Sequence, residues 1–169
     1  LMPATQGAIM WPSSGGVCTA LYEEEMLPLP DASVDNLLVV HCLEGSGQVR
    51  KLLRELWRVL KPEGSLIIIV PNRRGVWART DSTPFGHGQP YSPRQLERAL
   101  KEALLSPVDW SSALFMPPID RAFVRRTGLA IERIGGRIWP VFAGVNIVEA
   151  RKELTSPIGT AAVARRLPQ

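Results

Sequence analysis

The most regular pattern of apolar and polar positions lies between Leu27 and Asn72. Leu37–Val40 is a short apolar run without alternation, which is typical of a strand buried on both faces of a parallel sheet. From Val49 the apolar residues recur at steps of three and four, while arginine, lysine and glutamate fill the positions between them. This second pattern predicts an amphipathic helix that continues to Leu60.

A turn and another apolar run follow this helix. Lys61-Pro62-Glu63-Gly64 places a basic residue at the end of the helix and a glycine where a left-handed turn is expected. Ser65–Val70 predicts a second buried strand, which Pro71-Asn72 ends. A strand, a helix and a strand joined by short links form a right-handed parallel crossover unit, so the sequence predicts an α/β fold.

Weaker patterns outline the rest of the chain. Ser92 is a good N-cap with Pro93 at the first helical position, and Gln95 completes a capping box. The other expected elements are short strands at Leu1–Ala4 and Val17–Tyr22, a strand at Ser111–Met116, a helix at Ile119–Ile138 and a final strand at Phe142–Ala150. We expect one domain over residues 1–154 and a mobile tail over residues 155–169, which show no core pattern.

Composition narrows the class of protein. The 169 residues are 45% hydrophobic and 21% charged, as in an ordinary soluble globular domain, and no apolar run reaches the length of a membrane span. Cys18 and Cys42 lack the spacing of a zinc site or a disulfide framework, so we expect a reduced cytoplasmic setting. The net charge of +4 comes from scattered basic residues, which favours a solvated surface over a nucleic-acid patch.

Several segments, in the right order and at the right spacing, resemble class I S-adenosylmethionine-dependent methyltransferases of the small-molecule branch. The segments are Glu25–Asp35 (EMLPLPDASVD), the apolar strand, His41-Cys42-Leu43-Glu44 and Arg58–Gly64 (RVLKPEG). The resemblance covers residues 20–105 well and the remainder in outline. It implies a Rossmann-like, mostly parallel sheet with helices on both faces and an antiparallel final strand.

The same resemblance implies S-adenosylmethionine as cofactor and a set of residues around it. Glu23 takes the position of the acid that accepts the adenine amine, and Glu24 stands beside it. Met2 lies where an acid usually meets the ribose, and Val40 and His41 end a strand at the ligand crevice. Alternatively, the glutamates form a solvent-exposed acidic turn. The alternative for His41 is a buried core histidine whose hydrogen bonds are made within the protein.

The substrate side is expected after the second buried strand. Asn72 and Arg73 follow that strand, and a long segment without periodicity leads through His87 to Tyr91. The resemblance makes these four residues candidates for binding a small-molecule methyl acceptor. If the acceptor has to lose a proton, His87 is the first candidate base and His41 the second; the alternative is a structural loop.

The chain departs from the family at its beginning. No glycine-rich loop follows a strand there, so the family's opening strand, loop and helix are expected to be missing or replaced. Two other function classes stay open: a non-catalytic methyltransferase-like module that binds a protein partner, and a nucleic-acid methyltransferase. A nicotinamide-dependent dehydrogenase would need a G-x-G-x-x-G fingerprint that the sequence does not contain.

Overall fold

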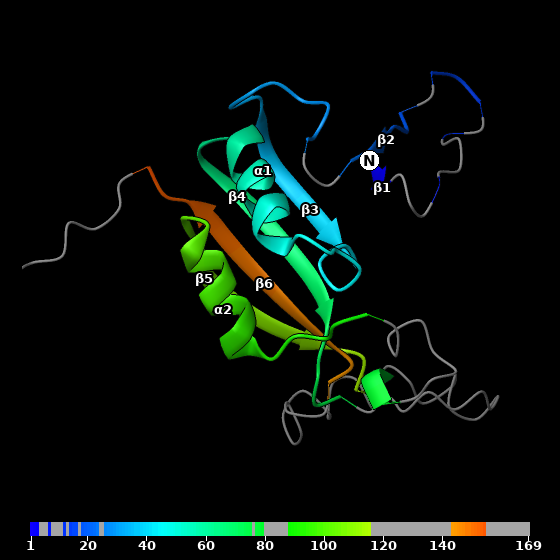
Figure 1. Ribbon diagram of the computed structural model, residues 1–169, viewed down its shortest axis with the longest axis vertical. Coiled ribbons are helices and arrows are strands. Elements are labelled where there is room, and N and C mark those ends of the chain that lie inside the picture. Colours follow the sequence, from blue (N-terminus) through cyan, green and yellow to red (C-terminus); the bar gives the residue numbers. More distant parts are fainter. Residues whose placement is uncertain are drawn as a thin grey trace, which may run out of the picture.

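A computed structural model describes residues 1–3, 7, 12, 14–16, 18–23, 26–75, 77–79, 88–115 and 143–154. Its strands are β1 (Met2–Pro3), β2 (Leu21–Tyr22), β3 (Val34–Val40), β4 (Leu60–Pro71), β5 (Leu105–Ala113) and β6 (Val145–Lys152). Its helices are α1 (Val49–Val59), α2 (Pro93–Glu102) and a short 3-10 turn, η2 (Trp77–Arg79). Figure 1 shows the four long strands side by side, with α1 and α2 in front of them.

The main sheet has the order β3-β4-β6-β5. Strands β3 and β4 are parallel, and α1 connects them, so the predicted crossover unit is confirmed. Strand β6 pairs antiparallel with both β4 and β5, which confirms the expected antiparallel final strand. The chain therefore has a Rossmann-like α/β fold with a mixed sheet.

Helix α1 forms where the sequence places its apolar stripe. Leu52, Leu53 and Leu56 are buried against the sheet, and the helix ends at Val59 because Leu60 is already extended. The turn after it differs from the prediction in one detail: the left-handed residue is Glu63, with φ +60°, and not Gly64. Gly64 is needed for a different reason, because a Cβ at that position would lie 2.9 Å from the Lys61 carbonyl oxygen.

The core lies on the face of the sheet that α1 and α2 cover. Buried side chains alternate along β4 at Leu66, Ile68 and Val70, in one cluster with the helices. On the other face Leu38 is 64% exposed and Val40 is 43% exposed. The expectation that Leu37–Val40 is buried on both faces is therefore wrong for the described part of the chain, where both long helices pack on the same face.

Among the later elements, α2 agrees with the prediction and β5 differs from it. Helix α2 has the predicted capping box between Ser92 and Gln95. Strand β5 begins at Leu105, earlier than the predicted Ser111. The helix expected at Ile119–Ile138 and the tail at residues 155–169 lie outside the described residues.

A second, two-stranded sheet stands apart from the main one (Figure 1), and in it β1 and β2 pair in parallel. In the described part of the chain, no strand pairs with the outer edge of β3. No described helix is long and apolar enough to cross a membrane.

Candidate functional site

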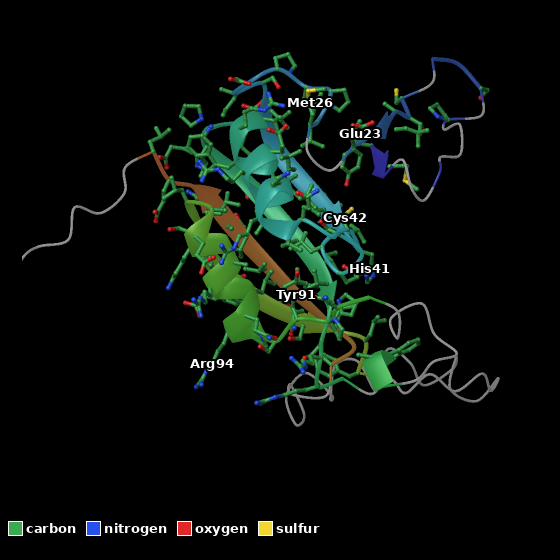
Figure 2. The ribbon with its side chains drawn as sticks, viewed as in Figure 1. Glu23, Met26, His41, Cys42, Tyr91 and Arg94 are labelled. Carbon is green, nitrogen blue, oxygen red and sulfur yellow. The ribbon has the colours of Figure 1, made fainter. Side chains whose placement is uncertain are left out.

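Polar side chains gather where β3 and β4 end. His41 and Cys42 follow β3 directly, and Tyr91 is bridged to Asn72, the residue after β4. Figure 2 shows His41 and Cys42 at the tip of β3, with Tyr91 near the end of β4. Because carboxyl ends of parallel strands meet at one edge of a sheet, this is where an α/β fold binds ligands.

His41 and Glu44 form a short hydrogen bond. Nδ1 of His41 lies 2.7 Å from Oε1 of Glu44, and the Glu44 side chain is only 9% exposed. The other carboxylate oxygen, Oε2, is buried and has no hydrogen-bond partner among the described residues. His41 itself adopts φ +52°, a left-handed conformation that is uncommon for any residue other than glycine. Such strained residues cluster at ligand sites.

The backbone around Gly88 holds Glu44 in place. The amide of Gln89 donates a 2.9 Å hydrogen bond to the carbonyl oxygen of Glu44. Gly88 has φ +86°, and a Cβ there would lie 2.4 Å from the same carbonyl oxygen. Only glycine allows this approach, so the segment before Tyr91 and the segment after β3 pack together at the site.

The charge of Glu44 acts on two neighbours. Burial, and then the Glu44 charge, raise the pKa of the Tyr91 phenol. Burial raises the pKa of the Cys42 thiol, and the negative charge of Glu44 raises it further. A hydrogen bond with Tyr22 lowers the same pKa but does not cancel the effect of burial. Tyr91 and Cys42 are therefore neutral near pH 7 and surround Glu44 with uncharged groups.

The predicted substrate residues separate into two groups. Asn72 is buried, donates through Nδ2 to the Ala143 carbonyl oxygen at 3.0 Å, and accepts through Oδ1 from the Arg74 amide. Asn72 thus holds the end of β4, and both of its polar groups are engaged. Arg73 and Tyr91, in contrast, both line a cavity of about 440 Å³. The remaining lining residues are Gly88, Gln89, Pro90 and Gln95.

The predicted cofactor residues lie in two places. Met2 in β1 and Glu23 after β2 belong to the two-stranded sheet, whereas Val40 and His41 end β3. Glu23 is exposed, and its carbonyl oxygen accepts the amide of Met26 at 3.0 Å. In Figure 2 Glu23 lies near β2, away from His41. Glu24 and His87 lie outside the described residues.

The described residues match the groups of S-adenosylmethionine in part. The exposed carboxylate of Glu23 is an acceptor suited to an adenine amine, and Val40 offers apolar surface at the strand end. Met2 has only a thioether, which is a weak acceptor for ribose hydroxyls. No described group of His, Cys, Asp or Glu side chains could hold a metal ion.

Glu44 is the site residue that the sequence reasoning missed. In the sequence Glu44 belongs only to the segment His41-Cys42-Leu43-Glu44 that carries the resemblance, which predicts no role for it. The signal was its spacing of three residues after His41, directly beyond a strand. Its burial and the strained backbone of His41 could be found only from the structure.

These features define a Rossmann-like α/β domain with a candidate ligand site at the carboxyl ends of β3 and β4. Residues 15–68 match the family described as a methyltransferase domain. This match spans about a third of the chain, and the fold resembles that of class I S-adenosylmethionine-dependent methyltransferases. No curated protein matches the chain.

Solved structures share this fold at low sequence identity. A possible histamine N-methyltransferase from Thermotoga maritima is 18% identical with a TM-score of 0.57, and the match covers 79% of this chain and 63% of that one. A putative methyltransferase from Haloferax volcanii, in complex with the Trm112 activator, is 19% identical with a TM-score of 0.56, covering 81% and 61%. The [4+2]-cyclase SpnF is 22% identical with a TM-score of 0.55, covering 80% and 56%. The chain thus spans about three fifths of the length of these relatives.

Proposed function

We propose that the protein transfers a methyl group from S-adenosylmethionine to a small-molecule acceptor. The observation that supports this most directly is the cluster of His41, Glu44 and Tyr91 at the ends of β3 and β4. It lies at the edge of the sheet where a methyltransferase domain binds its ligands. The nearby cavity beside Arg73 gives the acceptor a place to bind.

Each candidate cofactor residue has a distinct role in this proposal. Glu23 accepts the adenine amine, with Glu24 beside it, Met2 lies at the ribose, and Val40 and His41 border the reacting end. When bound, S-adenosylmethionine supplies an electrophilic methyl group on a sulfonium. The protein then contributes mainly position and exclusion of water, because in-line displacement needs alignment more than an activated protein nucleophile.

The acceptor side consists of Arg73, Tyr91 and His87. Arg73 is exposed at the cavity and can bind an anionic or carbonyl group of the acceptor. Tyr91 presents a neutral phenol that donates or accepts a hydrogen bond. We assign Asn72 to the support of this surface, since both of its polar groups are engaged by backbone.

Calorimetric titration of the full-length protein with S-adenosylmethionine and with S-adenosylhomocysteine tests the proposal. We expect Glu23→Gln to weaken binding roughly tenfold or more, since a hydrogen bond to a charged group is lost. Asp109→Asn is the matched control, because Asp109 is an exposed acid on β5, away from the site. Absence of binding by the wild type at millimolar ligand would show the enzyme proposal to be wrong.

A second candidate function is a non-catalytic module that binds a protein partner. Among the described residues no strand pairs with the outer edge of β3, which favours this function because unpaired strand edges pair readily with other chains. Leu38 and Val40 are also exposed on one face of this strand. This alternative predicts that neither S-adenosylmethionine nor S-adenosylhomocysteine binds. It also predicts that the protein forms a complex of fixed stoichiometry with its protein partner. The same calorimetric titration therefore separates the two functions.

A further inference from the structure

The cavity of about 440 Å³ at the end of β4, called the Arg73 cavity below, has a positively charged and donor-rich lining. Its polar side chains are those of Arg73, Gln89, Tyr91 and Gln95, and none of its described lining residues is acidic. The charge of Glu44 reaches Tyr91, but Glu44 is not among the described residues that line the cavity. The described lining therefore suits a ligand with a negatively charged group.

The backbone holds Arg73 at the edge of this cavity. The amide of Arg73 donates to the carbonyl oxygen of Tyr91 at 3.2 Å, and the amide of Tyr91 donates to the carbonyl oxygen of Pro71 at 3.1 Å. The next amide, that of Arg74, donates to Oδ1 of the buried Asn72 at 3.1 Å. Because the backbone is already fixed, only the Arg73 side chain has to be ordered when a ligand binds, which keeps the entropic cost of binding low.

The charge of Arg73 has no protein counterion in the described part of the chain. On the adjacent α2, Arg98 pairs with Glu102 at 2.9 Å and Lys101 with Glu97 at 2.7 Å. The Arg73 side chain forms no ion pair or hydrogen bond with the described residues. A guanidinium stays charged at neutral pH, and its planar fork matches the oxygens of a carboxylate or a phosphate. Arg73 can therefore give its full charge to a ligand in the cavity.

Gln95 and Tyr91 add hydrogen-bond donors beside this guanidinium. Oε1 of Gln95 accepts the amide and the hydroxyl of Ser92 at 3.1 and 2.9 Å. A backbone amide can only donate, so the oxygen of the Gln95 side chain faces Ser92 and the NH₂ group, with its two donors, faces the other way. Burial, and then the Glu44 charge, keep the Tyr91 phenol protonated, so that it too can donate.

We propose that Arg73 is a specificity-determining residue that selects a methyl acceptor carrying a carboxylate or phosphate group. The inference rests on the proposed function and narrows its acceptor from small molecules in general to anionic ones. The anionic oxygens bind the fork of Arg73, and Gln95 and Tyr91 donate to them from the side. A cationic acceptor is disfavoured, because it would face a like charge in the same cavity.

A second cavity supplies the matched control. It has a volume of about 300 Å³ and is lined by Arg74, Ser92, Pro93 and Arg94. Figure 2 shows Arg94 on α2, directed away from Tyr91. Arg94→Gln removes one positive charge close to the Arg73 cavity without changing its lining. This variant separates direct binding by Arg73 from a general positive potential, which salt screens.

Nitrogen-15 NMR titration of the full-length protein with benzoate and with phenyl phosphate tests the inference. Benzamide is the uncharged control probe, and the Arg73→Gln variant assigns the Nε–H signal of Arg73. At about 0.15 M salt we expect a saturable shift of this signal with at least one of the two anions, and none with benzamide. Which anion binds more tightly then distinguishes a carboxylate acceptor from a phosphate acceptor.

The variants show which arginine holds the anion. We expect Arg73→Gln to raise the Kd roughly tenfold or more, read from the signals of Tyr91 and Gln95, because a charge-assisted hydrogen bond is lost. Arg73→Lys keeps the charge without the fork and should lose part of the affinity, whereas Arg94→Gln should change the Kd by less than about twofold. The inference is overturned if neither anion binds at about 10 mM, if benzamide binds as tightly, or if Arg94→Gln costs as much as Arg73→Gln.

The outcome is independent of the test of the proposed function. If S-adenosylmethionine fails to bind while benzoate or phenyl phosphate binds at Arg73, the proposed function is wrong and an anion site remains. If S-adenosylmethionine binds and Arg73 responds to neither anion, the proposed function stands and this inference fails.

Discussion

Arg58 joins the last turn of α1 to the proline-rich segment before β3. Its guanidinium donates to the carbonyl oxygens of Leu27 at 3.1 Å and Leu29 at 3.0 Å. It also donates to Glu55 at 2.8 Å and to Asp31 at 2.5 Å. Glu55 in turn accepts the Leu27 amide at 3.0 Å, so the arrangement closes on itself. We expect Arg58→Met to release this segment from α1.

The expected loss follows from the exposure of each partner. The side chains of Arg58 and Glu55 are 28% and 17% exposed, so their hydrogen bonds are partly shielded from water. A hydrogen bond to a charged group contributes about 1.5–3 kcal/mol to stability. The hydrogen bonds to the two carbonyl oxygens add to this, but less than fully, because they share the Arg58 side chain. Asp31 is 79% exposed and contributes at most about 1 kcal/mol. We expect Arg58→Met to lower the free energy of unfolding by about 3 kcal/mol.

Urea denaturation followed by circular dichroism measures this loss. Arg98→Met is the matched control, because Arg98 is 81% exposed and forms an ordinary helical ion pair with Glu102, worth about 0.5 kcal/mol. Arg58→Lys keeps the charge but not the forked geometry, so most of the loss should remain. If Arg58→Met costs no more than Arg98→Met, the reasoning about this cluster is refuted.

Three further predictions concern other parts of the chain. The hydrogen bond from Arg58 holds the pKa of the Glu55 carboxyl below its ordinary value of 4.5. The stability that this ion pair gives to the folded state is therefore complete above pH 4.5 and is lost as the pH falls through the lowered pKa. Urea titrations from about pH 6 to about pH 3 should therefore show a smaller decline in Glu55→Gln than in the wild type. In Gly75→Ala the new Cβ would lie 2.3 Å from a carbonyl oxygen, so we expect the free energy of unfolding, measured by urea denaturation, to fall by about 1–3 kcal/mol. Gly47→Ala is the control and should change it little, because no atom lies within 4 Å of the new Cβ. Because the pKa of Cys42 is raised, iodoacetamide should modify it more slowly than the exposed Cys18, as mass spectrometry can measure.

The crossover unit could be predicted from the sequence because its signals are local. The apolar run of β3, the helical period of α1 and the apolar run of β4 each identify their own element. The capping box of α2 is likewise contained within four residues. The antiparallel final strand came from the resemblance and not from periodicity, which carries no information on strand direction.

The remainder depended on contacts between distant segments. Whether Leu38 is buried depends on what packs on the second face of the sheet. The apolar run Leu37–Val40 carries no information on that packing. In the turn after α1 the left-handed residue is Glu63, whereas Gly64 is required because a Cβ there would lie 2.9 Å from the Lys61 carbonyl oxygen. For β3 the local pattern identified the strand correctly, and the packing on its second face decided the exposure of Leu38.

The two halves of the candidate site lie on different sheets, and this has a consequence for binding. Glu23 follows β2, whereas His41 follows β3. Tyr22 links the two, since it is 7% exposed within the core cluster and forms a hydrogen bond with Cys42. A ligand that contacts both Glu23 and His41 therefore stabilises the docking of β2 against the end of β3 as well as its own contacts. If S-adenosylmethionine binds as proposed, its affinity depends on how firmly Tyr22 is packed, because Tyr22 connects the two parts of the candidate site.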